Sequence, residues 1–394
     1  MSAVSSERTT LRRSWTAVAA AFSSHAVIAG LLGPWMPDLK DRTAIDDGGL
    51  GLALAGYAAG LFVGTRLAGP LVRAIGGRAA VRAGIPAMAV AAALLPAAGD
   101  LVSLAAIFVA IGLASGSVDV AMNIEAVDVE RRFGRRVMTA IHGAWSVSLF
   151  VGAGISSVGV AAAVPISVHL PITAAIVMAV AFPILRWLPR GDVGTVPREA
   201  ADAGDVPRRG ASTVALLGLI AGSSFLLEGV AMEWSAVYLR DGLGAAGGTV
   251  GLAVVVFSAG MAASRFVGDR LVGRFGQPIV VRIGAGLAVV SLAVMLLVPS
   301  VALSIVAFGA VGVGMGPVVP LAFRSAGWTA RTRGGTALPI VVTAGYTGSI
   351  VGPALVGPLA DAFGLRIAFV VPLVACAVVA VAAQATATTG PPVR

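Results

Sequence analysis

The chain has 394 residues and a net charge of +9, with 57% hydrophobic and only 12% charged residues. Soluble domains carry about 25% charged residues, so this composition excludes an ordinary soluble enzyme and predicts an all-α polytopic membrane protein embedded in a lipid bilayer. The single cysteine, Cys376, excludes an intramolecular disulfide and a cysteine-based metal cluster, and the three histidines lack metal-ligand spacing, so we expect neither a metal nor a cofactor.

Apolar stretches of about 20 residues are long enough to cross a bilayer. In chain order the sequence predicts twelve spans, at 14–36, 49–71, 79–98, 101–124, 138–160, 166–188, 213–236, 249–268, 279–298, 301–323, 337–359 and 367–388. The stretch 189–212, PRGDVGTVPREAADAGDVPRRG, is polar and rich in Pro and Gly, which is typical of a flexible linker. We therefore predict an N-terminal six-helix bundle at 1–188, a cytoplasmic linker at 189–212 and a C-terminal six-helix bundle at 213–394.

The basic residues predict the orientation of these spans. With the N-terminus inside, the extracytoplasmic loops hold four of the 28 Lys and Arg residues, namely Lys40, Arg42, Arg240 and Arg366. Because the others lie on or beside the opposite side, we expect both termini to be cytoplasmic and the protein to lie in a bacterial inner membrane. Charges confined to the ends of apolar runs also argue against a nucleic-acid partner.

The two halves repeat each other at an offset near 200. GTRLAGPLVRAIGGR at 64–78 is similar to ASRFVGDRLVGRFGQ at 263–277. Four glycines of the first half match glycines 200 positions later: Gly112, Gly116, Gly134 and Gly152 match Gly312, Gly316, Gly334 and Gly352. Parallel six-helix repeats place a substrate site near the bilayer midplane, and rocking of the halves gives alternating access.

These features resemble the major facilitator superfamily, and the resemblance covers nearly the whole chain. It is carried by the twelve spans, the central linker and the Gly-Asp-Arg-x-x-x-Arg-x-Gly signature that begins at Gly268. The segment DVAMN, at 119–123, is similar to an acidic-x-x-x-Asn element in the fourth helix of the fucose permease branch. Related members of that branch also share segments like HGAWS at 142–146 and EGVAMEWSAVYLRD at 228–241.

Asp119 is the first candidate for a proton carrier. An Asp at the centre of a membrane helix costs roughly 2.5–3.5 kcal/mol, so such acids usually line a cavity or relay protons. Asp119 and Asn123 are four residues apart and share one helix face. In the fucose permease pattern the acid at this position takes up and releases the coupling proton; the alternative is a hydrated structural group near the cytoplasm.

His142 is predicted at a depth similar to that of Asp119 on the following helix, so the two side chains could form a coupled pair. The alternative is a histidine bonded to a backbone carbonyl. The acids Glu125, Asp128 and Glu130 alternate with arginines, which predicts a solvated loop with interhelix ion pairs.

The first and seventh helices line the central cavity in the superfamily, which makes His25 and Glu228 candidates for substrate contact. Glu233 is five residues from Glu228, about 140° around the helix, so it cannot share that face. We place Glu233 near the outer rim, beside an aromatic belt residue. The predicted substrate-cavity set is His25, Asn123, Trp145, Glu228, Trp234 and Tyr346.

The resemblance also implies a cytoplasmic gate after the second and eighth helices. Its predicted residues are Arg66, Arg73, Arg78, Asp269, Arg270 and Arg274. The N-terminal copy departs from the pattern, because Pro70 stands where the acid should be; Asp128 or Glu130 could supply the missing anion. In the tenth helix, GVGMGPVVP should interrupt the hydrogen bonding, either to kink the helix for gating or to allow close packing.

We expect a monomeric proton-coupled secondary active transporter of a small organic solute, and no enzyme. The fucose permease pattern has a second acid in the first helix where this chain has Gly33, and the predicted cavity has few hydrogen-bonding groups. The resemblance implies a sugar-like solute, whereas these two departures favour an amphipathic metabolite. Import by symport follows from the match at Asp119, whereas a proton/drug antiporter that exports hydrophobic compounds is the alternative.

Overall fold

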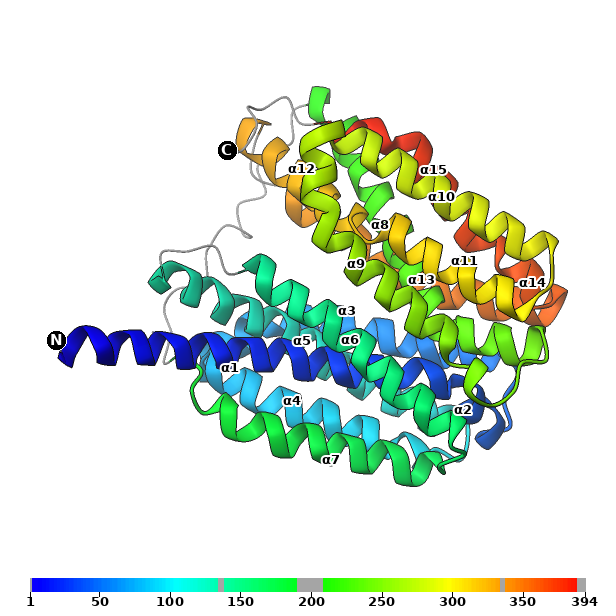
Figure 1. The fold of residues 1–394 in the computed structure, drawn as a ribbon, viewed down its shortest axis with the longest axis horizontal. Coiled ribbons are helices and arrows are strands. Elements are labelled where there is room, and N and C mark those ends of the chain that lie inside the picture. Colours follow the sequence, from blue (N-terminus) through cyan, green and yellow to red (C-terminus); the bar gives the residue numbers. More distant parts are fainter. Residues whose placement is uncertain (1, 134–137, 190–207, 334–336, 388–394) are drawn as a thin grey trace. The chain divides into compact units, whose positions relative to one another are not determined.

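The computed structural model describes residues 2–133, 138–189, 208–333 and 337–387, and every regular element within these ranges is a helix (Figure 1). The predicted number of spans is confirmed. Helices that are long and apolar enough to cross a membrane run over Leu11–Arg42, Asp47–Ile75, Gly77–Ala97, Leu101–Arg131, Ala140–Ala161, Ile166–Leu185, Ala211–Gly242, Gly247–Phe275, Gln277–Leu297, Val301–Thr329, Ala337–Phe363 and Leu365–Thr386.

The chain divides into two compact units. Unit 1 comprises Met1–Ile45 and Gly56–Val196, and unit 2 comprises Asp46–Ala55 and Pro197–Arg394. Most of the predicted linker, residues 190–207, lies outside the described residues, and helix α8 begins at Arg208. The predicted boundaries at 188 and 213 stay predictions.

Unit 1 is built on α1, whose long rod is the easiest element to follow in Figure 1. Helix α1 packs against α5, α6 and α7, and α4 packs against α5 and α7. The helices of this half are α1 (Ser2–Leu32), α2 (Met36–Arg42), α3 (Asp47–Ile75), α4 (Gly77–Leu94), α5 (Leu101–Phe133), α6 (Met138–Ala161) and α7 (Ile166–Leu185).

Unit 2 repeats this pattern of packing. Helix α8 packs against α12, α13 and α15, and α10 packs against α11 and α15. Its helices are α8 (Arg208–Val237), α9 (Leu252–Phe275), α10 (Gln277–Leu297), α11 (Val301–Met315), α12 (Val318–Arg333), α13 (Ala337–Phe363), α14 (Leu365–Ala368) and α15 (Val370–Ala382). The contacts of α1 with α6 and α7 thus correspond to those of α8 with α13 and α15, as the predicted repeat requires.

Two glycines at equivalent positions of the halves give the repeat its backbone signature. Gly76 has φ 85° and ψ 151°, and Gly276 has φ 82° and ψ 157°; each directly precedes a helix, α4 or α10. Residues with a Cβ rarely adopt this region. The sharp turn into the third and ninth spans is therefore the same in both halves.

Gly112 and Gly312 allow close helix packing at equivalent positions of the two units. A Cβ added at Gly112 of α5 would lie 2.7 Å from the backbone nitrogen of Leu61 in α3. At Gly312 of α11 it would lie 3.1 Å from the backbone nitrogen of Met261 in α9. Small residues let membrane helices approach to backbone contact. Because the two glycines occupy equivalent positions of the repeat, the glycine register reflects a helix spacing that both halves share.

We expect Gly112→Ala to lower the stability of the purified protein in detergent by about 1–3 kcal/mol, because the added methyl group has to displace backbone atoms of α3. Gly154→Ala is the matched control, since a Cβ at Gly154 would meet nothing within 4 Å. The measurement is the midpoint of thermal unfolding. Equal midpoints for the two variants would show that Gly112 does not set the helix spacing.

The start of α3 is held by carboxylates. Asp361, in the last turn of α13, accepts hydrogen bonds from the backbone N–H groups of Asp47 (3.0 Å) and Gly48 (2.7 Å). Asp46 accepts one from the N–H of Gly49 at 2.7 Å. The first N–H groups of a helix have no partner within the helix. Three carboxylate oxygens therefore satisfy the first turn of α3, and α3 then continues without interruption into unit 1.

Asp361→Ala should destabilise the protein by about 1 kcal/mol, the typical effect of losing an N-terminal helix cap. Asp361→Asn should have an intermediate effect, since its amide oxygen still accepts one hydrogen bond. Thermal unfolding of the two variants at neutral pH tests this order. A wild-type midpoint for Asp361→Ala would mean that water replaces the cap without loss.

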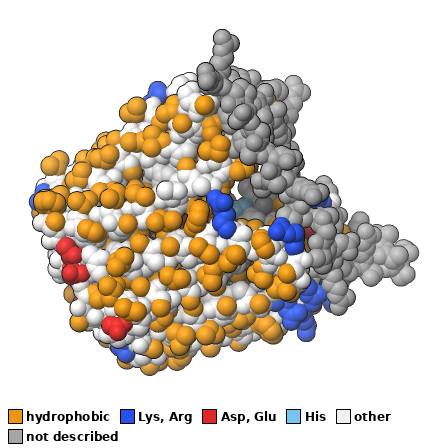
Figure 2. Space-filling view, turned by 180° about the vertical axis from the view of Figure 1, so that it is seen from behind, with side chains coloured by type: hydrophobic (Ala, Val, Ile, Leu, Met, Phe, Trp, Pro, Cys, Tyr) orange, Lys and Arg blue, Asp and Glu red, His pale blue; other side chains and the backbone are white. Residues whose placement is uncertain are grey.

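The outer surface of the helices is apolar, as a lipid-facing surface must be. Val102, Leu297 and Val381 are 77%, 75% and 83% exposed. Figure 2 shows one face covered mainly by hydrophobic side chains, with few charged ones. Soluble monomers rarely expose extended apolar patches, so this surface agrees with the twelve spans.

Candidate transport site

In unit 1, His25 lies near the middle of the first span and joins three helices. Its Nε2 is 2.8 Å from Oγ of Ser115 in α5, and its Nδ1 accepts a hydrogen bond of 3.2 Å from Nε1 of Trp145 in α6. An indole N–H can only donate, so Nδ1 carries no proton, and in a neutral ring Nε2–H donates to Ser115. His25 is 6% exposed. Both of its nitrogens therefore have partners in a site closed to water.

Sequence analysis predicted His25 and Trp145 as separate cavity residues, and the structure brings them into direct contact. Ser115 was missed. A signal for it was present, because Ser115, Asp119 and Asn123 follow each other at steps of four residues and so lie along one face of α5. This polar stripe starts at the His25 network and runs toward the end of α5 that is predicted to be cytoplasmic.

Asp119 is half-buried one helical turn from Ser115. The side-chain amide of Asn123 donates to the backbone oxygen of Asp119 at 2.8 Å and lies 3.4 Å from Oδ1 of its carboxyl group. Asp119 and Asn123 therefore lie on one face of α5, as predicted, and their side chains are in contact. Their roles in proton transfer and substrate binding stay predictions.

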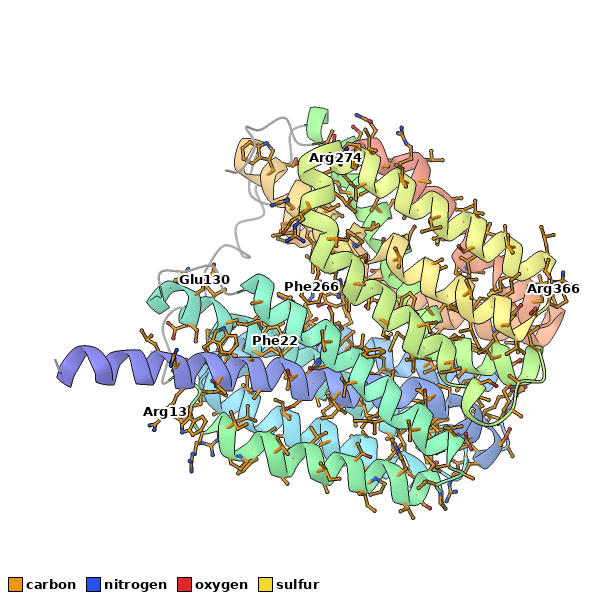
Figure 3. The ribbon with its side chains drawn as sticks, viewed as in Figure 1. Arg13, Phe22, Glu130, Phe266, Arg274 and Arg366 are labelled. Atoms are coloured by element: carbon orange, nitrogen blue, oxygen red, sulfur yellow. The ribbon has the colours of Figure 1, made fainter. Side chains whose placement is uncertain are left out.

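His142 lies on α6 and is exposed, with its ring edge-on to Phe22 of α1 at a centroid distance of 5.3 Å and an interplanar angle of 82°. Phe22 marks this part of α1 in Figure 3. The backbone oxygen of His142 accepts a hydrogen bond from Ser146. The contact to Phe22 fixes the ring beside the first helix, and the predicted pairing of His142 with Asp119 stays a prediction.

In unit 2, Glu228 near the middle of α8 interacts electrostatically with Arg265 of α9. Nε of Arg265 donates to the backbone oxygen of Gly316 at 3.1 Å. Gly316 lies between α11, which ends at Met315, and α12, which begins at Val318. The predicted interruption of the tenth span is thus confirmed. Arg265 was not among the predicted site residues, although it aligns with the predicted gate residue Arg66 in the internal repeat.

Trp234 and Glu233 of α8 and Tyr346 of α13 each lie in a different environment. Trp234 is fully buried, so a contact with substrate at this predicted position is closed off in this conformation. One carboxylate oxygen of Glu233 is buried and has no hydrogen-bond partner among the described residues, although the sequence placed Glu233 at an outer rim. The ring of Tyr346 packs against that of Phe225, with 5.7 Å between the ring centroids. The centroids of Phe225 and Phe323 are 6.2 Å apart.

Comparisons with known proteins agree with this architecture. A family model described as Major Facilitator Superfamily matches residues 216–394. The chain is 32% identical over 371 residues to the uncharacterized transporter y4wD of Sinorhizobium fredii. This match covers 94% of this chain and 97% of the relative. It is also 32% identical over 360 residues to an uncharacterized MFS-type transporter of Yersinia pestis, with 90% and 91% covered. The chain belongs to the major facilitator superfamily.

The fold is similar to that of a solved superfamily member, the nucleoside transporter NupG, with a TM-score of 0.74, 12% identity, and 95% of this chain and 98% of that chain covered. An identity this low shows the fold alone. Together with the twelve spans and the bacterial relatives, it makes the chain a multi-pass transporter of the inner membrane. The fucose permease branch stays a prediction.

The predicted gate residues of this superfamily member lie in the second halves of α3 and α9 and, for Arg78, in the first turn of α4. Oδ1 of Asp269 is 3.9 Å from Nη1 of Arg324 in α12, but the Asp269 side chain is 75% exposed, so this ion pair is weak. Arg78 donates to the backbone oxygen of Arg186 at 2.7 Å, at the end of α7. Arg66 and Arg274 lie over the rings of Phe62 and Phe275. Arg73 ends α3, and Arg270 adjoins Asp269 in α9.

The prediction that Glu125 belongs to a solvated loop is wrong. Helix α5 continues to Phe133, and Glu125 is 4% exposed. It is buried because it lies over Gly77, where an added Cβ would be 3.3 Å from the carboxyl carbon of Glu125. At the equivalent positions of unit 2, Ser325 donates to Oε1 of Gln277 at 3.0 Å. In both halves a side chain of the fourth span thus lies against the first residue of the third span, and in unit 2 the contact is a hydrogen bond.

Trp145→Phe should destabilise the protein by about 1–3 kcal/mol, because it leaves Nδ1 of the buried His25 ring without a donor. Trp15→Phe is the matched control, since Trp15 is 37% exposed. Thermal unfolding in detergent compares the two. If both variants unfold at the same temperature, the His25 network does not contribute to stability.

Proposed function

We propose that the protein is a proton-coupled secondary active transporter of a small organic solute, with Asp119 as its proton carrier. The observation that supports this most is the position of Asp119. It is an acid deep in an apolar span, one turn from the His25 network, and it receives a hydrogen bond from Asn123. Membrane proteins rarely keep such an acid without a functional reason.

In this mechanism Asp119 is protonated in one facing state and deprotonated in the other. Neutral and charged forms of an intramembrane carboxyl differ strongly in their interaction with a low-dielectric surrounding, so each form favours a different conformation. His142 modulates this step from α6, and Asp269 helps to close the cytoplasmic gate. Both termini are cytoplasmic, and the transporter works as a monomer.

Import by symport is the preferred direction, because Asp119 and Asn123 match the fucose permease element. Export of hydrophobic compounds by proton antiport is the second candidate. The cluster of Phe225, Phe323 and Tyr346 favours it, since three aromatic rings offer an apolar surface and one hydroxyl group.

Asp119→Asn should abolish accumulation of solute driven by a pH gradient in proteoliposomes, while exchange of solute across the membrane continues. The solute is first chosen by a thermal-shift screen of sugars, amino acids and hydrophobic metabolites. The control is Asp100→Asn at the start of the same helix. Hydrogen bonds from the side chain and backbone of Ser103 lower the pKa of Asp100, so that this carboxyl stays ionised at the working pH.

Asp100→Asn should accumulate solute like the wild type. Accumulation by Asp119→Asn at the wild-type level would rule out Asp119 as the proton carrier. The direction of proton movement in the wild type, followed with a pH-sensitive dye inside the vesicles, separates symport from antiport.

A further inference from the structure

Arg265 is a permanent positive charge within a membrane span. It lies in Gly247–Phe275, one turn before Asp269 of the predicted cytoplasmic gate. A guanidinium group cannot be deprotonated in a protein, and a cation at this depth is costly unless it is paired or functional. Within unit 2 Arg265 interacts electrostatically with Glu228 of the neighbouring helix α8.

The guanidinium group is fixed along one edge. Pro320 has no N–H, so it cannot give the hydrogen bond that the oxygen of Gly316, four residues earlier, would accept in a regular helix. Nε of Arg265 donates to that oxygen instead, at 3.1 Å. The two terminal nitrogens lie on the other edges of the group, in the planar geometry that matches a carboxylate.

An apolar surface begins one turn from the charged pair. Phe225 is three residues before Glu228 on α8, so the two side chains lie on the same face. Phe225 also contacts Phe323 of α12 and Tyr346 of α13. Glu228, which interacts with the cationic fork of Arg265 in α9, thus shares one face of α8 with a ring of the aromatic cluster. An amphipathic anion would need a cation and an apolar surface placed in this way.

We propose that Arg265 binds a carboxylate of the transported solute, replacing Glu228 as its partner, while the aromatic cluster of Phe225, Phe323 and Tyr346 holds the apolar part of the solute. The solute is then an amphipathic carboxylate. This inference rests on the proposed transport function and names its substrate class. Glu228 keeps the guanidinium neutralised when no solute is bound, which lowers the free-energy cost of the empty site.

A purely structural ion pair is the competing explanation, and it has different consequences. Buried ion pairs often add little net stability, whereas removing one partner leaves an unpaired charge. A structural pair would need both residues only for folding. Recognition of a solute would need Arg265 for binding but would not need Glu228.

The test is a binding experiment on the full-length protein in detergent. The probes are 3-phenylpropionate and benzoate, each compared with its uncharged amide, and binding is read from the rise in unfolding temperature with probe concentration. We expect the carboxylates to stabilise the wild type and the amides to have no effect. Arg265→Gln should weaken carboxylate binding at least tenfold, and Arg265→Lys should weaken it as well, since an ammonium group lacks the planar fork.

Two further variants keep the result interpretable. Arg282→Gln removes an exposed arginine from α10 and should bind like the wild type. Glu228→Gln should bind the carboxylates at least as tightly as the wild type, because the competing carboxylate is gone. If Arg265→Gln alone fails to fold, the double variant Glu228→Gln/Arg265→Gln, which leaves neither charge unpaired, replaces it.

Several outcomes would overturn the proposal. They are unchanged carboxylate binding by Arg265→Gln or by the double variant, loss of binding in Glu228→Gln, and failure of both carboxylates to stabilise the wild type. The experiment uses no gradient, so it is independent of proton coupling. Carboxylate binding without gradient-driven accumulation would refute only the proposed coupling, and accumulation of an uncharged solute would refute only the substrate class.

Discussion

A membrane span offers its buried polar groups no solvent, so each of them depends on another part of the protein for a partner. This constraint accounts for two of the contacts at the candidate site, and a similar need applies at a helix start. His25 bonds through both ring nitrogens, to helices α5 and α6. The oxygen of Gly316, freed by Pro320, is taken by Arg265. The first turn of α3 is satisfied by Asp361 and Asp46. In the first two cases, and at Asp361, the polar contact also joins two or more helices.

The two halves share a scaffold but not their chemistry. Gly112 lets α5 approach α3, and Gly312 lets α11 approach α9, which is the equivalent pair in unit 2. Gly76 and Gly276 turn the chain in the same way. The polar side chains on this scaffold differ. Unit 1 carries a network of His25, Ser115 and Trp145 that is uncharged when the ring is neutral, with one acid beside it, whereas unit 2 carries a pair of opposite charges. The repeat accounts for the shared spacing of the helices, whereas a few side chains give each half its own polar contacts.

The spans and the repeat could be predicted because they depend on local composition and on a period that is visible in the chain. Single contacts were harder. His25 and Trp145 were both predicted to line the cavity, but nothing in a linear pattern shows that one donates to the other. Ser115 could have been found from its four-residue step to Asp119. Glu125 was placed in solvent because it precedes a run of arginines; its burial depends on the missing side chain of Gly77, which lies on the preceding span.

The sequence left two explanations for the interruption of the tenth span, kinking for gating and close packing. The hydrogen-bond partner of the freed carbonyl bears on this choice. A proline in a membrane helix removes a donor, and the carbonyl that it leaves must be satisfied or hydrated. If kinking for gating were its only use, any polar neighbour or water would serve. The partner is instead the Nε of an arginine that is charged at every pH and is held near the middle of α9. Pro320 therefore does more than bend the chain. It frees the acceptor to which Arg265 donates, so the break in the tenth span and the arginine of the eighth span are joined by one hydrogen bond.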